Sequence, residues 1–129
     1  MNQPSLILNA VQLKQRIDRI AYQIYEDSSN EKELVIAGIS NSGYRFALLL
    51  NEVLKSICPI PTTLVEIKLD KENPTHYQLN PNHQITDFKN KTIIIVDDVL
   101  NSGKTLMYSL KPFLEGDVKK IRTALHLNG

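Results

Sequence analysis

The run of four β-branched residues at Ile93–Val96, followed at once by two aspartates, constrains the fold more than any other part of the chain. A strand that is apolar at every position needs cover on both faces, which is typical of a parallel sheet enclosed by helices. A second apolar run, Leu34–Ile39, has the same character. The two runs predict buried strands of an α/β fold.

Helical periodicity follows these runs. Apolar residues recur three and four positions apart in segments that predict helices over residues 10–26, 44–57 and 104–114. Pro112 is expected to kink or end the last helix, and Gly116 to stop it. Strands are expected over residues 34–39, 62–69, 92–97 and 120–127. This order predicts a single α/β domain with a mainly parallel, twisted sheet flanked by helices.

Two connecting segments are polar. Ser40–Gly43 is expected to form a tight turn between a strand and a helix. Asp70–Lys91 is expected to be a loop of about twenty residues, a length that is usually functional or mobile in a compact domain. His76 and His83 lie in this loop, and they are interpreted as solvated residues because their spacing fits no common metal-ligand pattern.

The overall composition narrows the functional classes. The chain has 129 residues, is 42% hydrophobic and carries a formal charge of +1, which fits one globular domain and is far less basic than a protein that mainly coats nucleic acid. Its single cysteine, Cys58, cannot form an internal disulfide. With no signal peptide pattern and no apolar run long enough to span a bilayer, we expect a soluble cytoplasmic protein.

Residues with binding chemistry are concentrated after the Ile93–Val96 run. Asp97 and Asp98 are expected at the carboxyl end of a buried strand, where open parallel sheets bind ligands. The polar turn Asn101–Gly103 then leads into a helix, whose free backbone N–H groups and dipole favour a phosphate. Two carboxylates that can accept hydrogen bonds from vicinal hydroxyl groups, next to a phosphate-binding turn, predict a sugar phosphate as the ligand.

Three other interpretations of this stretch are weaker. Its ending, Gly103-Lys104-Thr105, is similar to a P-loop, but that motif needs a glycine where this chain has Asp98. The acidic pair is also found near the start of receiver domains of two-component signalling, yet only 31 residues follow Asp98. A plain buried strand that ends in solvated acids leaves the Ser-Gly-Lys-Thr turn unexplained.

The stretch Asp97–Thr105 resembles the phosphoribosyl diphosphate (PRPP) signature of the type I phosphoribosyltransferases. Over about residues 6–129, including Val35–Ala47, the chain is similar to the bifunctional pyrimidine-operon attenuator and uracil phosphoribosyltransferase proteins. The resemblance implies that Asp97 and Asp98 hold the ribose hydroxyls and that the residues from Asn101 onward wrap the 5-phosphate. The PRPP-binding residues that it implies are Asp97, Asp98, Val99, Leu100, Asn101, Ser102, Gly103, Lys104 and Thr105.

The same resemblance assigns three further features. Asp70–Lys91 would be the mobile loop over the reacting centre, with Lys71 as its catalytic cation, and Lys68 or Lys71 would bring positive charge to the leaving group. Magnesium would enter with the diphosphate and lie near Asp97 and Asp98. The pyrophosphate loop, whose backbone amides bind the leaving group, would consist of Ser40, Asn41, Ser42 and Gly43.

The activity implied by the resemblance is transfer of a phosphoribosyl group from PRPP to a nucleobase, uracil or another pyrimidine, with release of pyrophosphate. A homodimer is also implied. The alternatives are a nucleotide-sensing regulator that binds RNA and a non-catalytic PRPP-binding remnant. RNA binding would require the basic residues of the first helix and those near the end of the chain to share a face. These residues are Lys14, Arg16, Arg19, Lys119, Lys120 and Arg122.

The chain departs from the family pattern in three places. Related attenuator proteins carry lysine and arginine around the pyrophosphate loop, where this chain has Ser40 and Ser42. Lys71 lacks the bidentate reach of an arginine. In relatives the nucleobase is held by a portion that follows the last strand, so residues 1–129 are expected to form a phosphoribosyltransferase-like domain without that base-binding part.

Overall fold

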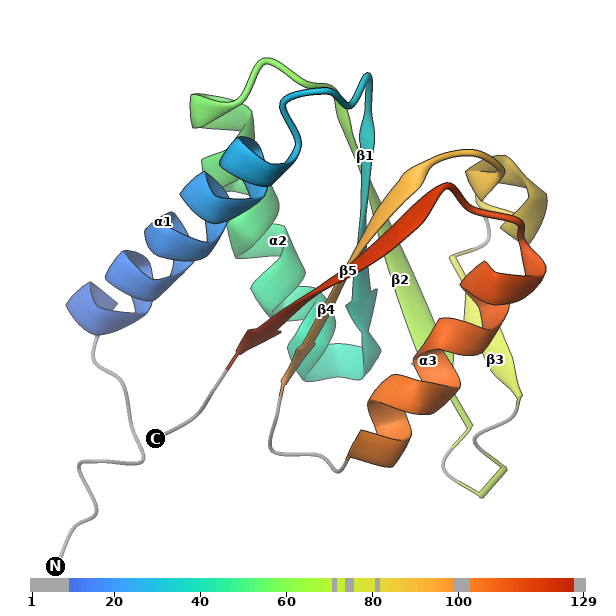
Figure 1. The fold of residues 1–129 in the computed structure, drawn as a ribbon. Coiled ribbons are helices and arrows are strands. Elements are labelled where there is room, and N and C mark those ends of the chain that lie inside the picture. The colour runs from blue at the N-terminus through green and yellow to red at the C-terminus, as the bar shows by residue number, and fades with distance from the viewer. Residues whose placement is uncertain (1–9, 71, 74–75, 81, 99–102, 127–129) are drawn as a thin grey trace, which may run out of the picture.

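The computed structural model describes residues 10–70, 72–73, 76–80, 82–98 and 103–126. It contains one five-stranded sheet with helices on both sides (Figure 1). This architecture confirms the predicted α/β fold. In chain order the elements are α1 (Ala10–Asp27), β1 (Leu34–Ile39), α2 (Ser40–Ile57), β2 (Thr62–Leu69), β3 (Tyr77–Leu79), the 3-10 helix η2 (Ile85–Phe88), β4 (Thr92–Asp98), α3 (Gly103–Glu115) and β5 (Lys120–His126).

The strands are arranged in the order β3-β2-β1-β4-β5. The central strand β1 pairs in parallel with β2 and with β4, and β5 pairs in parallel with β4. Only β3 is antiparallel, and it pairs with β2. After β1 the chain moves toward β2, whereas after β4 it moves the opposite way toward β5. Open α/β sheets bind ligands at such a reversal, which lies here between β1 and β4.

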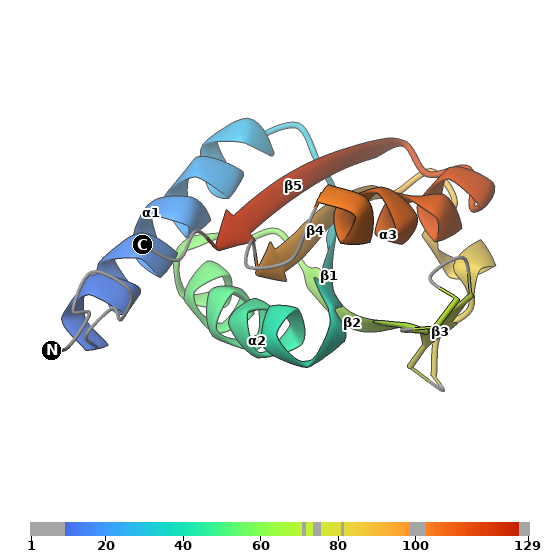
Figure 2. The same ribbon diagram turned by 90° about the horizontal axis from the view of Figure 1, so that it is seen from below.

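Helices α1 and α2 cover one face of the sheet, and α3 with η2 covers the other (Figure 2). Because side chains alternate along a strand, β1 and β4 contribute to both apolar layers. This arrangement explains why both strands are apolar at nearly every position. The side chains toward α1 and α2 are Leu34, Ile36, Ile94 and Val96, and those toward α3 and η2 are Val35, Ala37, Ile39, Ile93 and Ile95.

Residues 70–91 contain regular structure, so the prediction of one long loop is wrong. The short strand β3 forms a hairpin with β2, and η2 is closed by a capping box between Gln84 and Asp87. The Phe88 side chain of η2 is 1% exposed, and its ring centroid lies 5.7 Å from that of Phe113 on α3. A strand of three residues is too short to show a periodic pattern in the sequence, and one buried aromatic residue shows no pattern by itself.

Two helix boundaries also differ from the prediction. Helix α2 begins at Ser40, directly after β1, so the separate turn predicted over Ser40–Gly43 is wrong. Small polar residues suit the first turn of a helix as well as a loop, since the N–H groups there have no partner within the helix. Helix α3 continues past Pro112 to Glu115, whereas Gly116 stops it as predicted, with its N–H donating to the Pro112 and Phe113 carbonyl oxygens. Within the described residues, no helix combines the length and apolarity that a bilayer crossing requires.

Candidate functional site

The parallel strands end at one edge of the sheet, the lower edge in Figure 1. There β1 ends at Ile39 and continues directly into α2, and β4 ends at Asp98. Helix α3 begins at Gly103, shortly after β4. The amino termini of α2 and α3 therefore lie at the same edge as the two aspartates that the sequence singled out.

Asp97 is the most completely described side chain of the predicted site. It is only 4% exposed, and its backbone is in register with Leu125 of β5. Alternation along β4 places Asp97 on the same side as Ile93 and Ile95, the side that α3 covers. A carboxylate so far removed from water is fixed in position by its surroundings, which is what recognition of a ligand hydroxyl group requires.

Two glycines set the position of α2 against the sheet. A β-carbon on Gly43 would lie 2.9 Å from the Val96 carbonyl oxygen and 3.5 Å from the Asp97 Cα, so the first turn of α2 touches the end of β4. A β-carbon on Gly38 would lie 2.5 Å from the Tyr44 Cα, so β1 and α2 also pack closely. Both contacts need the absence of a side chain. They bring the start of α2 next to Asp97.

The start of α2 has the properties of an anion-binding segment. Its first turn consists of Ser40, Asn41, Ser42 and Gly43, and it contains no acidic residue. The backbone N–H groups of a first helical turn have no partner within the helix, and the helix dipole favours negative charge there. The predicted pyrophosphate loop is thus the first turn of a helix, and it lies beside the carboxyl end of β4.

Part of the predicted site lies outside the described residues. This applies to Lys71 and to the segment Val99, Leu100, Asn101 and Ser102. For Asp98, Gly103, Lys104 and Thr105 the structure describes the backbone, which ends β4 and begins α3. The site that the described residues define therefore consists of Asp97, the backbone of Asp98 and the amino termini of two helices.

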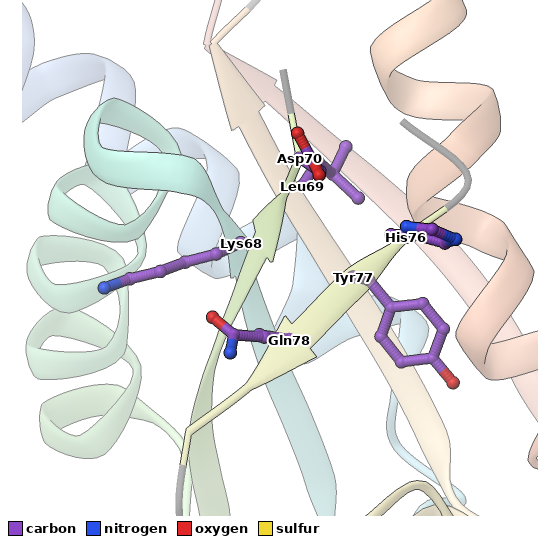
Figure 3. A pocket seen from close by; sticks show the side chains of 6 residues that line it. All are labelled: Lys68, Leu69, Asp70, His76, Tyr77 and Gln78. Carbon is purple, nitrogen blue, oxygen red and sulfur yellow. The ribbon is translucent and has the colours of Figure 1, made fainter. Parts of the chain in front are cut away.

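An open cavity of about 420 Å³ lies beside the β2–β3 hairpin at the same edge of the sheet (Figure 3). It is lined by Lys68, Leu69, Asp70, His76, Tyr77 and Gln78. The pKa of the Tyr77 hydroxyl is raised, first by burial and then by the nearby Glu115 carboxylate. The sequence did not reveal this cavity, because it depends on the short strand β3 that had no periodic signal.

The two loop histidines differ in their surroundings. His76 is exposed, and its Nε2 lies 3.4 Å from the Asn73 side-chain amide, which confirms the prediction for this residue. His83 is half-buried and its ring centroid lies 6.1 Å from that of Phe88, so the prediction that it is solvated is wrong. No group of three or more histidine, cysteine, aspartate or glutamate side chains suited to a metal occurs within the described ranges.

Of the basic residues proposed for RNA binding, one from α1 and one from β5 line the same cavity. Arg19 and Arg122 line one cavity of about 590 Å³ between these two elements. Arg122 is paired with Asp27 at 2.9 Å. Lys14 is paired with Asp18 at 2.9 Å and Lys119 with Glu31 at 3.0 Å. Much of the predicted basic surface is therefore neutralised by neighbouring acids.

Comparison with curated proteins gives matches along most of the chain. The bifunctional protein PyrR of Streptococcus mutans is 32% identical over 101 residues, which cover 78% of this chain and 57% of that protein. The bifunctional protein PyrR of Staphylococcus epidermidis is 31% identical over 118 residues, which cover 84% of this chain and 66% of that protein. The chain thus spans between 57% and 66% of the length of these two relatives.

Solved structures confirm the fold. A hypoxanthine-guanine phosphoribosyltransferase from Bacillus anthracis superposes with a TM-score of 0.72 at 21% identity, covering 93% of this chain and 68% of the other. A hypoxanthine phosphoribosyltransferase from Trypanosoma cruzi, complexed with the product IMP, gives a TM-score of 0.79 at 16% identity, covering 93% and 60%. The family model for the phosphoribosyl transferase domain matches residues 5–129. The chain therefore belongs to the phosphoribosyl transferase domain family.

Proposed function

We propose that this chain binds PRPP at the carboxyl edge of its sheet and transfers the phosphoribosyl group to a nucleobase, with uracil or another pyrimidine as the acceptor. The observation that carries the proposal is the nearly buried Asp97 beside the first turn of α2, which Gly43 brings up to the end of β4. Membership of the phosphoribosyl transferase domain family supports the class of reaction. The similarity to the PyrR proteins supports a pyrimidine acceptor.

The proposed reaction needs no nucleophile from the protein. The bond between the ribose C1 and the diphosphate oxygen breaks, a bond from C1 to a base nitrogen forms, and the proton of that nitrogen passes to solvent. Because C1 becomes cation-like, the protein must orient the reactants, stabilise the leaving diphosphate and exclude water. Asp97 and Asp98 accept hydrogen bonds from the ribose hydroxyls. The N–H groups at the start of α2 face the diphosphate, and those at the start of α3 face the 5-phosphate.

The donor set at this edge of the sheet fits a magnesium ion. Mg²⁺ prefers oxygen ligands and is usually bound by one or two carboxylates together with substrate phosphates. Asp97 and Asp98 would supply carboxylates, and the Asp97 Cα lies next to the helix turn proposed for the diphosphate. Bound there, magnesium would neutralise negative charge on the leaving group.

The test is calorimetric titration with Mg·PRPP, followed by a uracil turnover assay in the same sample. We expect Asp97→Asn to weaken PRPP binding by at least about ten-fold while circular dichroism shows an unchanged fold, because hydrogen bonds to a charged group contribute about 1.5–3 kcal/mol each. Asp117→Asn is the matched control, since residue 117 has φ 55°, which asparagine tolerates, and is exposed. Unchanged PRPP binding in Asp97→Asn would refute the assignment. Binding without turnover would favour a PRPP-binding remnant.

A second function, RNA binding by a regulator, is supported by Arg19 and Arg122, which line one cavity together with Asp27, the ion-pair partner of Arg122. A basic patch that contacts RNA phosphates gives an affinity that falls steeply as the salt concentration rises. We expect such salt dependence, together with weaker binding in Arg19→Gln, if the chain has this role. If the chain does not bind RNA even at low salt, RNA binding is excluded as its function. For either function we propose a homodimer, which analytical ultracentrifugation would test.

A further inference from the structure

The helix turn proposed to bind the diphosphate carries no lysine or arginine. The first turn of α2, the proposed diphosphate-binding segment, carries only Ser40, Asn41, Ser42 and Gly43. Backbone N–H groups can orient a diphosphate, but departure of this group increases its negative charge. Fixed positive charge at the leaving oxygens is a large term in such reactions. A lysine or arginine from a neighbouring element is therefore expected.

The register of the sheet identifies Lys68 as a neighbour of this turn. Gly38 of β1 is paired with Glu66 of β2, and Ile39 with Ile67. The next position in this register places Lys68 beside Ser40. On the other side of β1, Gly38 is paired with Val96, which places Asp98 level with Ser40 as well. Lys68 on β2, the start of α2 directly after β1, and Asp98 on β4 thus form a row across the carboxyl ends of these three strands. Two strand spacings separate the ends of this row by about 10 Å.

The Lys68 side chain lies on the side of the sheet that α2 covers. Val65 and Ile67 pack into the apolar layer under α3, so alternation directs Lys68 to the opposite side. Figure 3 shows the Lys68 side chain extended on the α2 side of the hairpin, whereas Tyr77 projects toward α3. The register therefore places the Lys68 backbone level with the amino terminus of α2, and the side chain extends on the side of the sheet that α2 covers. The four-carbon stem lets its ammonium group move to meet a phosphate.

The surroundings leave the Lys68 ammonium group available for a ligand. Lys68 is exposed, and no ion pair joins it to an acid in the part of the chain that the structure describes. Its cross-strand partner is the neutral Gln78. Glu66 is two residues away on the same side, and its backbone N–H is bonded to the Asn80 side chain. Lys68 also lines two cavities beside the hairpin, the one of about 420 Å³ described above and another of about 200 Å³.

We infer, on the basis of the proposed function, that Lys68 supplies the positive charge to the diphosphate of PRPP. In this arrangement α2 provides the backbone N–H donors and the neighbouring strand β2 provides the cation. The role is confined to the diphosphate. Lys68 interacts with the leaving group, while the ribose and the 5-phosphate are held by β4 and α3.

The experiment compares three ligands in the presence of magnesium: PRPP, inorganic pyrophosphate and ribose 5-phosphate. In Lys68→Met we expect affinity for PRPP and for pyrophosphate to fall by at least about ten-fold, the loss typical of a charge-assisted hydrogen bond. Affinity for ribose 5-phosphate is expected to stay unchanged, because this ligand has no diphosphate. Lys68→Arg should restore most of the binding. Lys55→Met is the matched control, since Lys55 is an exposed lysine in the last turn of α2, at the opposite end of the helix.

The outcomes separate this inference from the proposed function. If the wild-type chain binds PRPP and Lys68→Met binds PRPP and pyrophosphate equally well, the role of Lys68 is refuted while the site stands. An equal loss for all three ligands also refutes it, because it would indicate a structural effect. If the wild-type chain binds neither PRPP nor pyrophosphate, the proposed function fails and the role of Lys68 fails with it.

Discussion

Replacing Gly43 by alanine tests whether close contact between α2 and β4 builds the site. The new β-carbon would lie 2.9 Å from the Val96 carbonyl oxygen and 3.6 Å from the Ile39 Cβ. The first of these distances is well below ordinary van der Waals contact, and a backbone carbonyl in a central strand cannot move aside as a flexible side chain can. The first turn of α2 must therefore shift away from β4.

The change in the free energy of unfolding is the difference between two opposing contributions. Overpacking of this kind typically costs about 1–3 kcal/mol, whereas alanine is favoured over glycine in a helix interior by up to about 1 kcal/mol. We therefore expect Gly43→Ala to lower the free energy of unfolding by about 1 kcal/mol. That corresponds to a fall in Tm of roughly 3–6 °C for a domain of this size. PRPP affinity should fall as well, because the N–H donors of α2 move relative to Asp97.

Differential scanning calorimetry and titration with Mg·PRPP would measure the two effects. Gly116→Ala is the matched control, since its β-carbon would meet the Ile85 side chain at 2.9 Å and the Ile85 carbonyl oxygen at 3.0 Å, beyond the far end of α3. This control should lose stability and keep its PRPP affinity. A Gly43→Ala variant that is as stable as the wild type and binds PRPP equally well would refute the reasoning.

Two further predictions concern stability. Phe113→Ala should lower the free energy of unfolding by about 3–5 kcal/mol, because Phe113 is fully buried against Phe88; a change below about 1 kcal/mol in urea unfolding would contradict this packing. The pKa of Glu31 is lowered, chiefly by the hydrogen bond from the Thr92 hydroxyl and then by that from Lys119. The stability contributed by this carboxylate is therefore fully present above its ordinary pKa of 4.5 and is lost as the pH falls below that value. Glu31→Gln should show a shallower loss of stability at acid pH in the same unfolding assay, and an unchanged acid limb would count against the role of Glu31.

The sequence predicted the fold correctly in segments where many consecutive residues favour the same secondary structure. β1 and β2 have the predicted bounds, and β4 extends one residue beyond its predicted end. β1 and the apolar run of β4 are buried at every position, which leaves such a segment few alternative structures, whereas β2 was predicted from its alternating, β-branched sequence. The signal failed over Ser40–Gly43, where the same small polar residues suit a turn and a first helical turn equally. It failed again at β3, which depends on pairing with β2 more than on its own three residues.

Only part of the candidate site could be predicted from the sequence. Asp97 could be singled out because it directly follows an apolar strand, and the structure places it at the carboxyl edge of the sheet. The contact of Gly43 with β4 could not be predicted, since it joins residues more than fifty positions apart. That Lys68 lies level with the start of α2 could not be predicted either, because it depends on the register of β1 with β2, which a single sequence does not reveal.

The reversal of strand order between β1 and β4 has a consequence for the order of assembly. β1, α2 and β2 are consecutive in the chain and can associate through short-range contacts, but the aspartates join them only when β4 docks across a long loop closure. A partly folded chain would therefore have the turn proposed to bind the diphosphate without the two acids proposed to bind the ribose hydroxyls. A ligand that spans both parts would bind only the completed sheet, so it would stabilise the docking of β4 by mass action. If the chain binds PRPP as proposed, the concentration of PRPP would then influence how much of this protein stays folded.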